Sequence, residues 1–127
     1  MTAFLAPHGD RIYAALRIVA GFLFLCHGAQ KILGFFGGPP EMPAPMLWIA
    51  GGIELVGGAL VMVGFRTGWA AFLCSGLMAA AYFMAHQPKG LFPIENHGEL
   101  AAIYSFVFLL IAVRGSGIWS IDAARGN

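Results

Sequence analysis

The chain has 127 residues, of which 59% are hydrophobic and only 10% are charged, and its mean hydropathy is +0.78. Charged residues make up roughly a quarter of a soluble domain, so this composition predicts a protein embedded in a lipid bilayer, and the length predicts one domain, residues 1–127. The net charge is +1, and the seven basic residues are scattered along the chain. This distribution argues against a nucleic-acid surface, which needs clustered Lys and Arg.

Four stretches are apolar and long enough to cross roughly 30 Å of hydrocarbon as helices. They cover about residues 12–33, 46–65, 68–85 and 99–113. The connections "GFFGGPPEMPAP" and "HQPKGLFPIENHG" contain the Gly and Pro residues that interrupt helices, and "RTG" forms a tight turn. The first apolar run is followed by others, so we expect it to stay in the membrane and not to be a cleaved signal peptide. The predicted fold is an all-α membrane protein, an antiparallel bundle of four transmembrane helices.

The basic residues near the helix ends are distributed unequally between the two sides. The side of the N-terminus carries Arg11, Arg66, Arg114 and Arg125, and the other side carries Lys31 and Lys89. The positive-inside rule therefore predicts that both termini are cytoplasmic. In a bacterium the protein would lie in the plasma (inner) membrane, with its first and third loops outside.

Ionisable side chains from all four predicted helices fall in the outer half of the bundle. They are His27, Glu54, His86 and Glu99, with Lys31 one turn from His27 on the same face. At 1.5 Å per residue, His27 and Glu54 lie about 9 and 12 Å below the outer helix ends. An intramembrane acid usually faces protein and has a partner, so we interpret these five residues as a candidate ligand-binding cluster.

Simpler roles remain open for the same residues. Glu54 could pair with Lys31 or Arg17 as structural glue. His27 could donate a hydrogen bond to a neighbouring helix, and His86, at a helix end, could extend towards the membrane interface.

A second group of residues is predicted to be structural. Gly57 and Gly58 form a small-residue face on which another helix can pack closely. Arg17 is expected to meet Asp122 when the tail folds back, while Trp119 anchors that tail at the membrane interface.

Metal and thiol chemistry are not predicted. The ranges expected to be helical contain no His-x-x-x-His or Glu-x-x-His pair, so we predict no metal site. No haem, flavin or iron–sulfur motif is visible. Cys26 and Cys74 are expected to differ in depth by about 11 Å, which is too far for a disulfide.

The sequence resembles the DoxX-like membrane proteins almost end to end. "LRIVAGFLFLCHGAQKILGFFGG" is similar to the first helix of that family, with its His-Gly-x-x-Lys pattern, and "IAGGIELVGGALVMVGFRT" is similar to the second. The ending from "AHQPKG" to "WSIDAA" resembles the family's ending. His97, in "NHGE", and Ser116, in "GSG", are less typical of the family.

The resemblance implies a role in redox chemistry. Some relatives are similar to a membrane subunit of a thiosulfate:quinone oxidoreductase, and others are associated with oxidative stress or thiol redox. We therefore expect a quinone-like ligand in the outer half, with Glu54 and His27 transferring protons and a redox protein partner or bound substrate supplying electrons. The resemblance leaves open whether this chain is itself an enzyme, for example as a quinone-facing subunit of an oxidoreductase.

Two other functions are compatible with the sequence. One is a proton-coupled small-molecule exporter that works as a homo-oligomer and uses Glu54 as its coupling carboxylate. The other is a structural or assembly subunit without a ligand of its own.

Overall fold

The computed structural model describes residues 2–126, which form helices and connecting segments with no strand among them. The all-α prediction is therefore confirmed. The long elements are α1 (Gly9–Leu33), α2 (Ala44–Gly52), α3 (Gly58–Val63), α4 (Thr67–Ala81) and α6 (Glu99–Arg114). A π-helical turn, η2 (Ile53–Gly57), joins α2 to α3, and a second, η3 (Tyr82–His86), extends α4. The short elements are η1 (Ala6–His8), η4 (Gln87–Lys89), α5 (Pro93–Asn96) and α7 (Ile121–Ala124).

Three segments within residues 2–126 are long and apolar enough to cross a membrane: Ala6–Leu33, Ala44–Val63 and Thr67–Lys89. The fourth predicted helix, α6, has only 16 residues, a length of about 24 Å at 1.5 Å per residue. It ends at Arg114, and the next residue, Gly115, has a φ of 83°. The structure thus supports a membrane protein with three candidate spans, and the four-span bundle stays a prediction.

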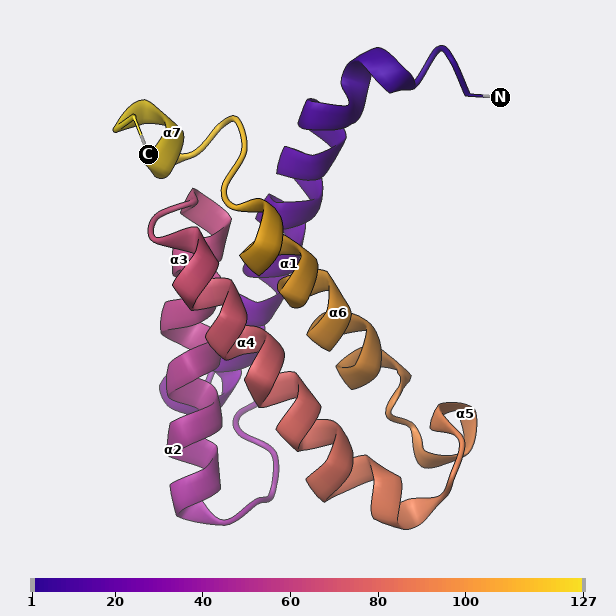
Figure 1. Ribbon diagram of the computed structural model, residues 1–127. Coiled ribbons are helices and arrows are strands. Elements are labelled where there is room, and N and C mark those ends of the chain that lie inside the picture. Colours follow the sequence, from indigo (N-terminus) through magenta and orange to yellow (C-terminus); the bar gives the residue numbers. More distant parts are fainter. Residues whose placement is uncertain (1, 127) are drawn as a thin grey trace.

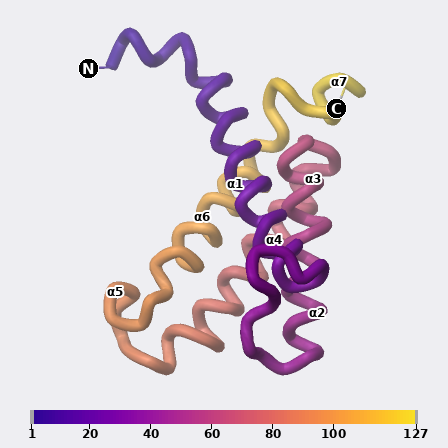
Figure 2. Tube along the Cα trace, turned by 180° about the vertical axis from the view of Figure 1, so that it is seen from behind, coloured from indigo at the N-terminus to yellow at the C-terminus, as the bar shows by residue number. Residues whose placement is uncertain are grey.

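The helices are arranged as two antiparallel pairs. α1 packs against α2, η2 and α3, and α4 packs along α6. The pairs join where α4 meets η2 and α3. Both described ends of the chain lie at one end of the molecule, and α5 lies at the other (Figure 1 and Figure 2). The arginine-rich helix ends and the termini therefore share a side, as the sequence indicated.

Adjacent glycines let the second helical segment approach two neighbours. A Cβ on Gly58 would lie 2.6 Å from the backbone nitrogen of Leu25 and 2.8 Å from the carbonyl oxygen of Gly21, both on α1. A Cβ on Gly57 would lie 2.7 Å from the sulfur of Cys74 on α4. The two glycines therefore face different helices, and neither position has room for a side chain without a shift of its neighbours.

Arg17 is completely buried and binds the C-terminal segment. Its guanidinium donates to the carbonyl oxygens of Val61 at 3.1 Å, Ile118 at 3.0 Å and Trp119 at 2.7 Å, and also to that of Ser116. Trp119 itself is exposed. The tail does fold back to Arg17, and backbone carbonyls bind the guanidinium there.

The predicted contact between Asp122 and Arg17 is absent from the hydrogen bonds and ion pairs of the described residues. The Asp122 carboxylate instead accepts from the backbone nitrogens of Arg66 at 3.0 Å and Thr67 at 3.1 Å and from the Thr67 hydroxyl at 3.0 Å. These amides begin α4 and lack partners within that helix. Burial raises the pKa of Asp122, but the hydrogen bonds from Thr67 and Arg66 and the charge of Arg125 outweigh it, so the pKa lies below its usual value of 3.8.

Candidate functional site

Glu54 and Lys31 form a largely buried ion pair between η2 and α1. The Lys31 Nζ lies 2.7 Å from the Glu54 Oε2, and the two side chains are 11% and 5% exposed. Of the two partners considered for Glu54, Lys31 is therefore the one in contact, and Arg17 is occupied by the tail. Two charges that share a site shielded from water are coupled strongly, since removing one partner leaves the other uncompensated.

A cavity of about 180 Å³ adjoins the Glu54 side of this ion pair. Its polar wall is built from α1, η2, η3, α6 and the loop before α6. The polar residues lining it are His27, Glu54, His86, His97 and Tyr104. His27 and His97 are exposed, whereas Glu54 and Tyr104 are buried. The cavity therefore has a buried polar end and an open end.

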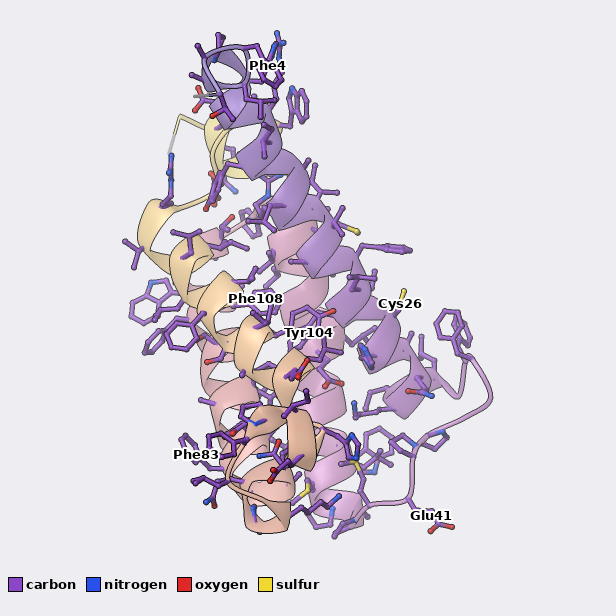
Figure 3. The ribbon with its side chains drawn as sticks, turned by 90° about the vertical axis from the view of Figure 1, so that its right-hand side faces the viewer. Phe4, Cys26, Glu41, Phe83, Tyr104 and Phe108 are labelled. Carbon is purple, nitrogen blue, oxygen red and sulfur yellow. The ribbon has the colours of Figure 1, made fainter. Side chains whose placement is uncertain are left out.

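Aromatic and apolar side chains form the rest of the cavity wall. The rings of Phe24 and Tyr104, which line it, lie 5.5 Å apart between centroids, and Phe108, which is buried outside the lining, lies 4.7 Å from Phe24 and 5.7 Å from Tyr104. Tyr104 and Phe108 lie between α6 and the rest of the bundle in Figure 3. Met78, Leu100 and Ala101 complete the apolar lining. This combination of ring faces with polar groups suits a flat, partly polar ligand.

Both π-helical turns contribute a side chain to the cavity. Glu54 is in η2 and His86 is in η3. A π-helical turn contains one residue more than an α-helical turn and changes which side chains face inward, and such turns are frequent at functional sites. The two turns therefore aim a carboxylate and an imidazole from different helices at the same space.

His86 is held by the loop before α6 through Asn96, which is fully buried. The Asn96 side chain donates to the carbonyl oxygen of Gly90 at 3.0 Å and the hydroxyl of Tyr82 at 3.2 Å, and accepts from the Gly98 nitrogen at 2.8 Å. The Asn96 backbone carbonyl lies 3.1 Å from the His86 Nδ1. Asn96 thereby ties the loop to η3 and orients the imidazole.

The structure brings most of the sequence-predicted cluster together. His27, Glu54 and His86 line one cavity, and Lys31 joins them through its ion pair. Glu99 is exposed and is not among the lining residues, although Leu100 and Ala101, which follow it on α6, are. Glu99 is therefore outside the candidate site.

Three contributors were not predicted from the sequence. His97 was noted only as atypical of the family, yet it lines the cavity and has a φ of 61°. Tyr104 lies on the inward face of an apolar helix, and its hydroxyl is the only feature that distinguishes it from the apolar residues around it. Asn96 ends α5; it lies in the ending that resembles the family, but no role was predicted for it.

Within residues 2–126, no three His, Cys, Asp or Glu side chains are close enough to hold a metal ion. Cys26 and Cys74 are both free thiols. Cys26 points away from the bundle in Figure 3, whereas Cys74 is buried.

Comparisons with known proteins agree with this description. The family profile DoxX matches residues 12–87. A protein of Haemophilus influenzae named "Uncharacterized protein" is 45% identical over 86% of this chain and 87% of its own length. The "Inner membrane protein YqjF" of Escherichia coli is 32% identical over 84% of this chain and 85% of its own. The "Putative oxidoreductase CatD" of Bacillus subtilis is 27% identical over 84% of this chain and 81% of its own. No solved structure gives a significant match.

Proposed function

The chain belongs to the DoxX family of membrane proteins, and from this premise we propose that it binds the ring of a quinone-like ligand in the cavity beside Glu54. One observation carries the proposal. A buried Lys31–Glu54 ion pair and the Phe24–Tyr104 ring pair meet at one cavity within an apolar bundle. A purely structural ion pair has no need of an adjoining cavity.

The size of the cavity fits a ring and not a whole lipid. About 180 Å³ is below the roughly 300–1,000 Å³ of sites that enclose a complete drug-sized ligand. His27, His97 and Leu100, all exposed, lie on its open side. A ligand could therefore insert its ring while its apolar tail stays among the lipids.

The side chains fit the chemistry of such a ligand, because a bound quinone supplies two-electron redox chemistry that also moves two protons. Glu54 can take or release a proton at its carboxylate, and His27 can do so at its imidazole. Lys31 neutralises the Glu54 carboxylate when the acid is ionised. The electrons would come from a redox protein partner or a bound substrate, and the name of the Bacillus subtilis relative favours a redox role.

The proposal includes an orientation in the membrane. The end that carries Arg11, Arg66, Arg114 and Arg125 would face the cytoplasm together with both termini. The cavity would then lie in the outer half of the membrane, and the redox partner would act from that side.

The two alternatives explain fewer of these contacts. An exporter of cations needs a coupling carboxylate that is free to bind its substrate, whereas Glu54 is already paired with Lys31. A structural or assembly subunit would use the ion pair but leaves the open, ring-lined cavity without a purpose. A homo-oligomer is compatible with each function.

Native mass spectrometry and lipid extraction of the gently purified protein test the proposal. We expect a quinone to co-purify with the wild-type chain and with His8→Ala, since His8 is exposed and remote from the cavity. His27→Ala should weaken binding by about 1–3 kcal/mol, the cost of stranding a polar partner. Absence of any quinone, or equal retention by the two variants, would count against the proposal.

A further inference from the structure

The hydrogen bond to the loop determines what His86 can offer a ligand. A carbonyl oxygen only accepts hydrogen bonds, so the His86 Nδ1, 3.1 Å from the Asn96 carbonyl, must donate. In a neutral imidazole the other nitrogen, Nε2, is then an acceptor. The buried Asn96 fixes this arrangement through its side-chain bonds to Gly90, Tyr82 and Gly98.

Glu54 is an acceptor at the same cavity. Its ion pair with Lys31 makes it a carboxylate, which has no hydrogen to donate. Lys31 contacts only Oε2. Among the described residues, every fully buried side-chain oxygen or nitrogen has a hydrogen-bond partner. Oε1 makes no such bond among these residues, so it must be accessible, and Glu54 lines the cavity.

Glu54 and His86 indicate which redox state of the ligand the cavity prefers. A quinone presents two carbonyl oxygens, which can only accept, so against Glu54 and His86 they would face other acceptors and would depend on His27, His97 or Tyr104 for a donor. A quinol presents two hydroxyl donors. We infer that the site binds the reduced, quinol form in preference to the quinone, an inference that rests on the proposed function and specifies its ligand.

Calorimetric titration of the full chain in lipid nanodiscs tests the preference. The probes are a short-chain 1,4-benzoquinol kept reduced under argon, the matching quinone, and the dimethyl ether of the quinol, which keeps the ring but loses both donors. All three probes are titrated at the same pH of about 8. We expect the quinol to bind at least tenfold more tightly than either control.

Two variants locate the preference. His86→Phe keeps an aromatic ring but removes the acceptor, so it should reduce the quinol-to-quinone affinity ratio severalfold. His8→Phe, outside the cavity, should leave the ratio unchanged. Nitrogen-15 spectra of the histidines in the wild-type chain give an independent measurement that does not depend on whether a His86 variant folds, and His86 should carry its hydrogen on Nδ1. The His86 signal is assigned by elimination with His8→Ala, His27→Ala and His97→Ala.

The possible results distinguish the inference about the quinol from the proposed function itself. If the quinone or the ether binds as tightly as the quinol, the inference is overturned while the proposed function stands. If none of the three probes binds, the proposed function fails. If the spectra place the hydrogen of His86 on Nε2, the inference is overturned whatever the binding data give.

Discussion

A single methyl group added at Gly58 should weaken the bundle. In Gly58→Ala the new Cβ would lie 2.6 Å from the Leu25 nitrogen, 2.8 Å from the Gly21 oxygen and 3.0 Å from the Leu25 Cα. All three are backbone atoms of α1, so no side-chain rotation can relieve the contact. The two helices must separate instead, and overpacking of this kind costs about 1–3 kcal/mol.

Gly52→Ala on the same helical segment is the matched control. Nothing lies within 4 Å of a Cβ placed at Gly52. Both substitutions carry the same gain of about 0.5–1 kcal/mol from the better helix propensity of Ala. The difference in stability between Gly58→Ala and Gly52→Ala therefore isolates the steric cost, about 1–3 kcal/mol.

Thermal unfolding in mild detergent, followed by circular dichroism, measures this difference. At roughly 4 °C per kcal/mol for a chain of this size, Gly58→Ala should unfold about 4–12 °C below Gly52→Ala. Equal midpoints for the two variants would refute the close approach of α1 and α3, and with it the position of Glu54 relative to Lys31.

Three further predictions concern the membrane orientation and the tail. A cysteine at Glu41 should react with a membrane-impermeant reagent in intact cells, whereas one at Arg125 should react only after lysis; the reverse pattern would invert the orientation. Arg17→Met removes the donor from the buried Val61 carbonyl, at about 1–3 kcal/mol, and from the partly buried tail carbonyls, so limited proteolysis should release the segment around Trp119 faster than in wild type, and an unchanged rate would contradict the contact. Because the folded pKa of Asp122 lies below its usual 3.8, the stability difference between wild type and Asp122→Ala should be complete above about pH 4 and vanish as the pH falls through that lower value; a difference that persists at lower pH would assign it to another cause.

The helices and the cluster of polar residues could be read from the sequence because they depend on composition and spacing. Apolar runs of sufficient length indicated the helices, and an acid in such a run indicated a partner. The sequence narrowed that partner to Lys31 or Arg17 but could not choose between them. The choice depends on the tail, whose backbone carbonyls accept the hydrogen bonds of Arg17. Every residue has a backbone carbonyl, so the sequence does not show which ones bind a side chain.

The details that shape the cavity were beyond sequence reasoning. A π-helical turn occurs as a single turn inside an α-helix, so η2 and η3 could not be located from the apolar pattern. Asp122 was assigned to Arg17 by charge, yet the free amides at the start of α4 bind it instead. Glu99 was predicted at the same depth as the cluster, but it does not line the cavity. Depth could be counted along a helix, whereas rotation about the helix axis could not.

Photolabelling with a short-chain azidoquinone tests most directly whether the cavity is the ligand site. Labelled peptides should carry the probe on the α1 and α6 residues that line the cavity, such as Phe24 and Tyr104. Leu100→Trp adds bulk on the open side of the cavity and should abolish this labelling. Ile103→Trp is equally exposed on the same helix but does not line the cavity, so it should leave the labelling intact. Labelling elsewhere on the chain, or labelling that survives in Leu100→Trp as well as in Ile103→Trp, would contradict the assignment of the cavity as a quinone-binding site.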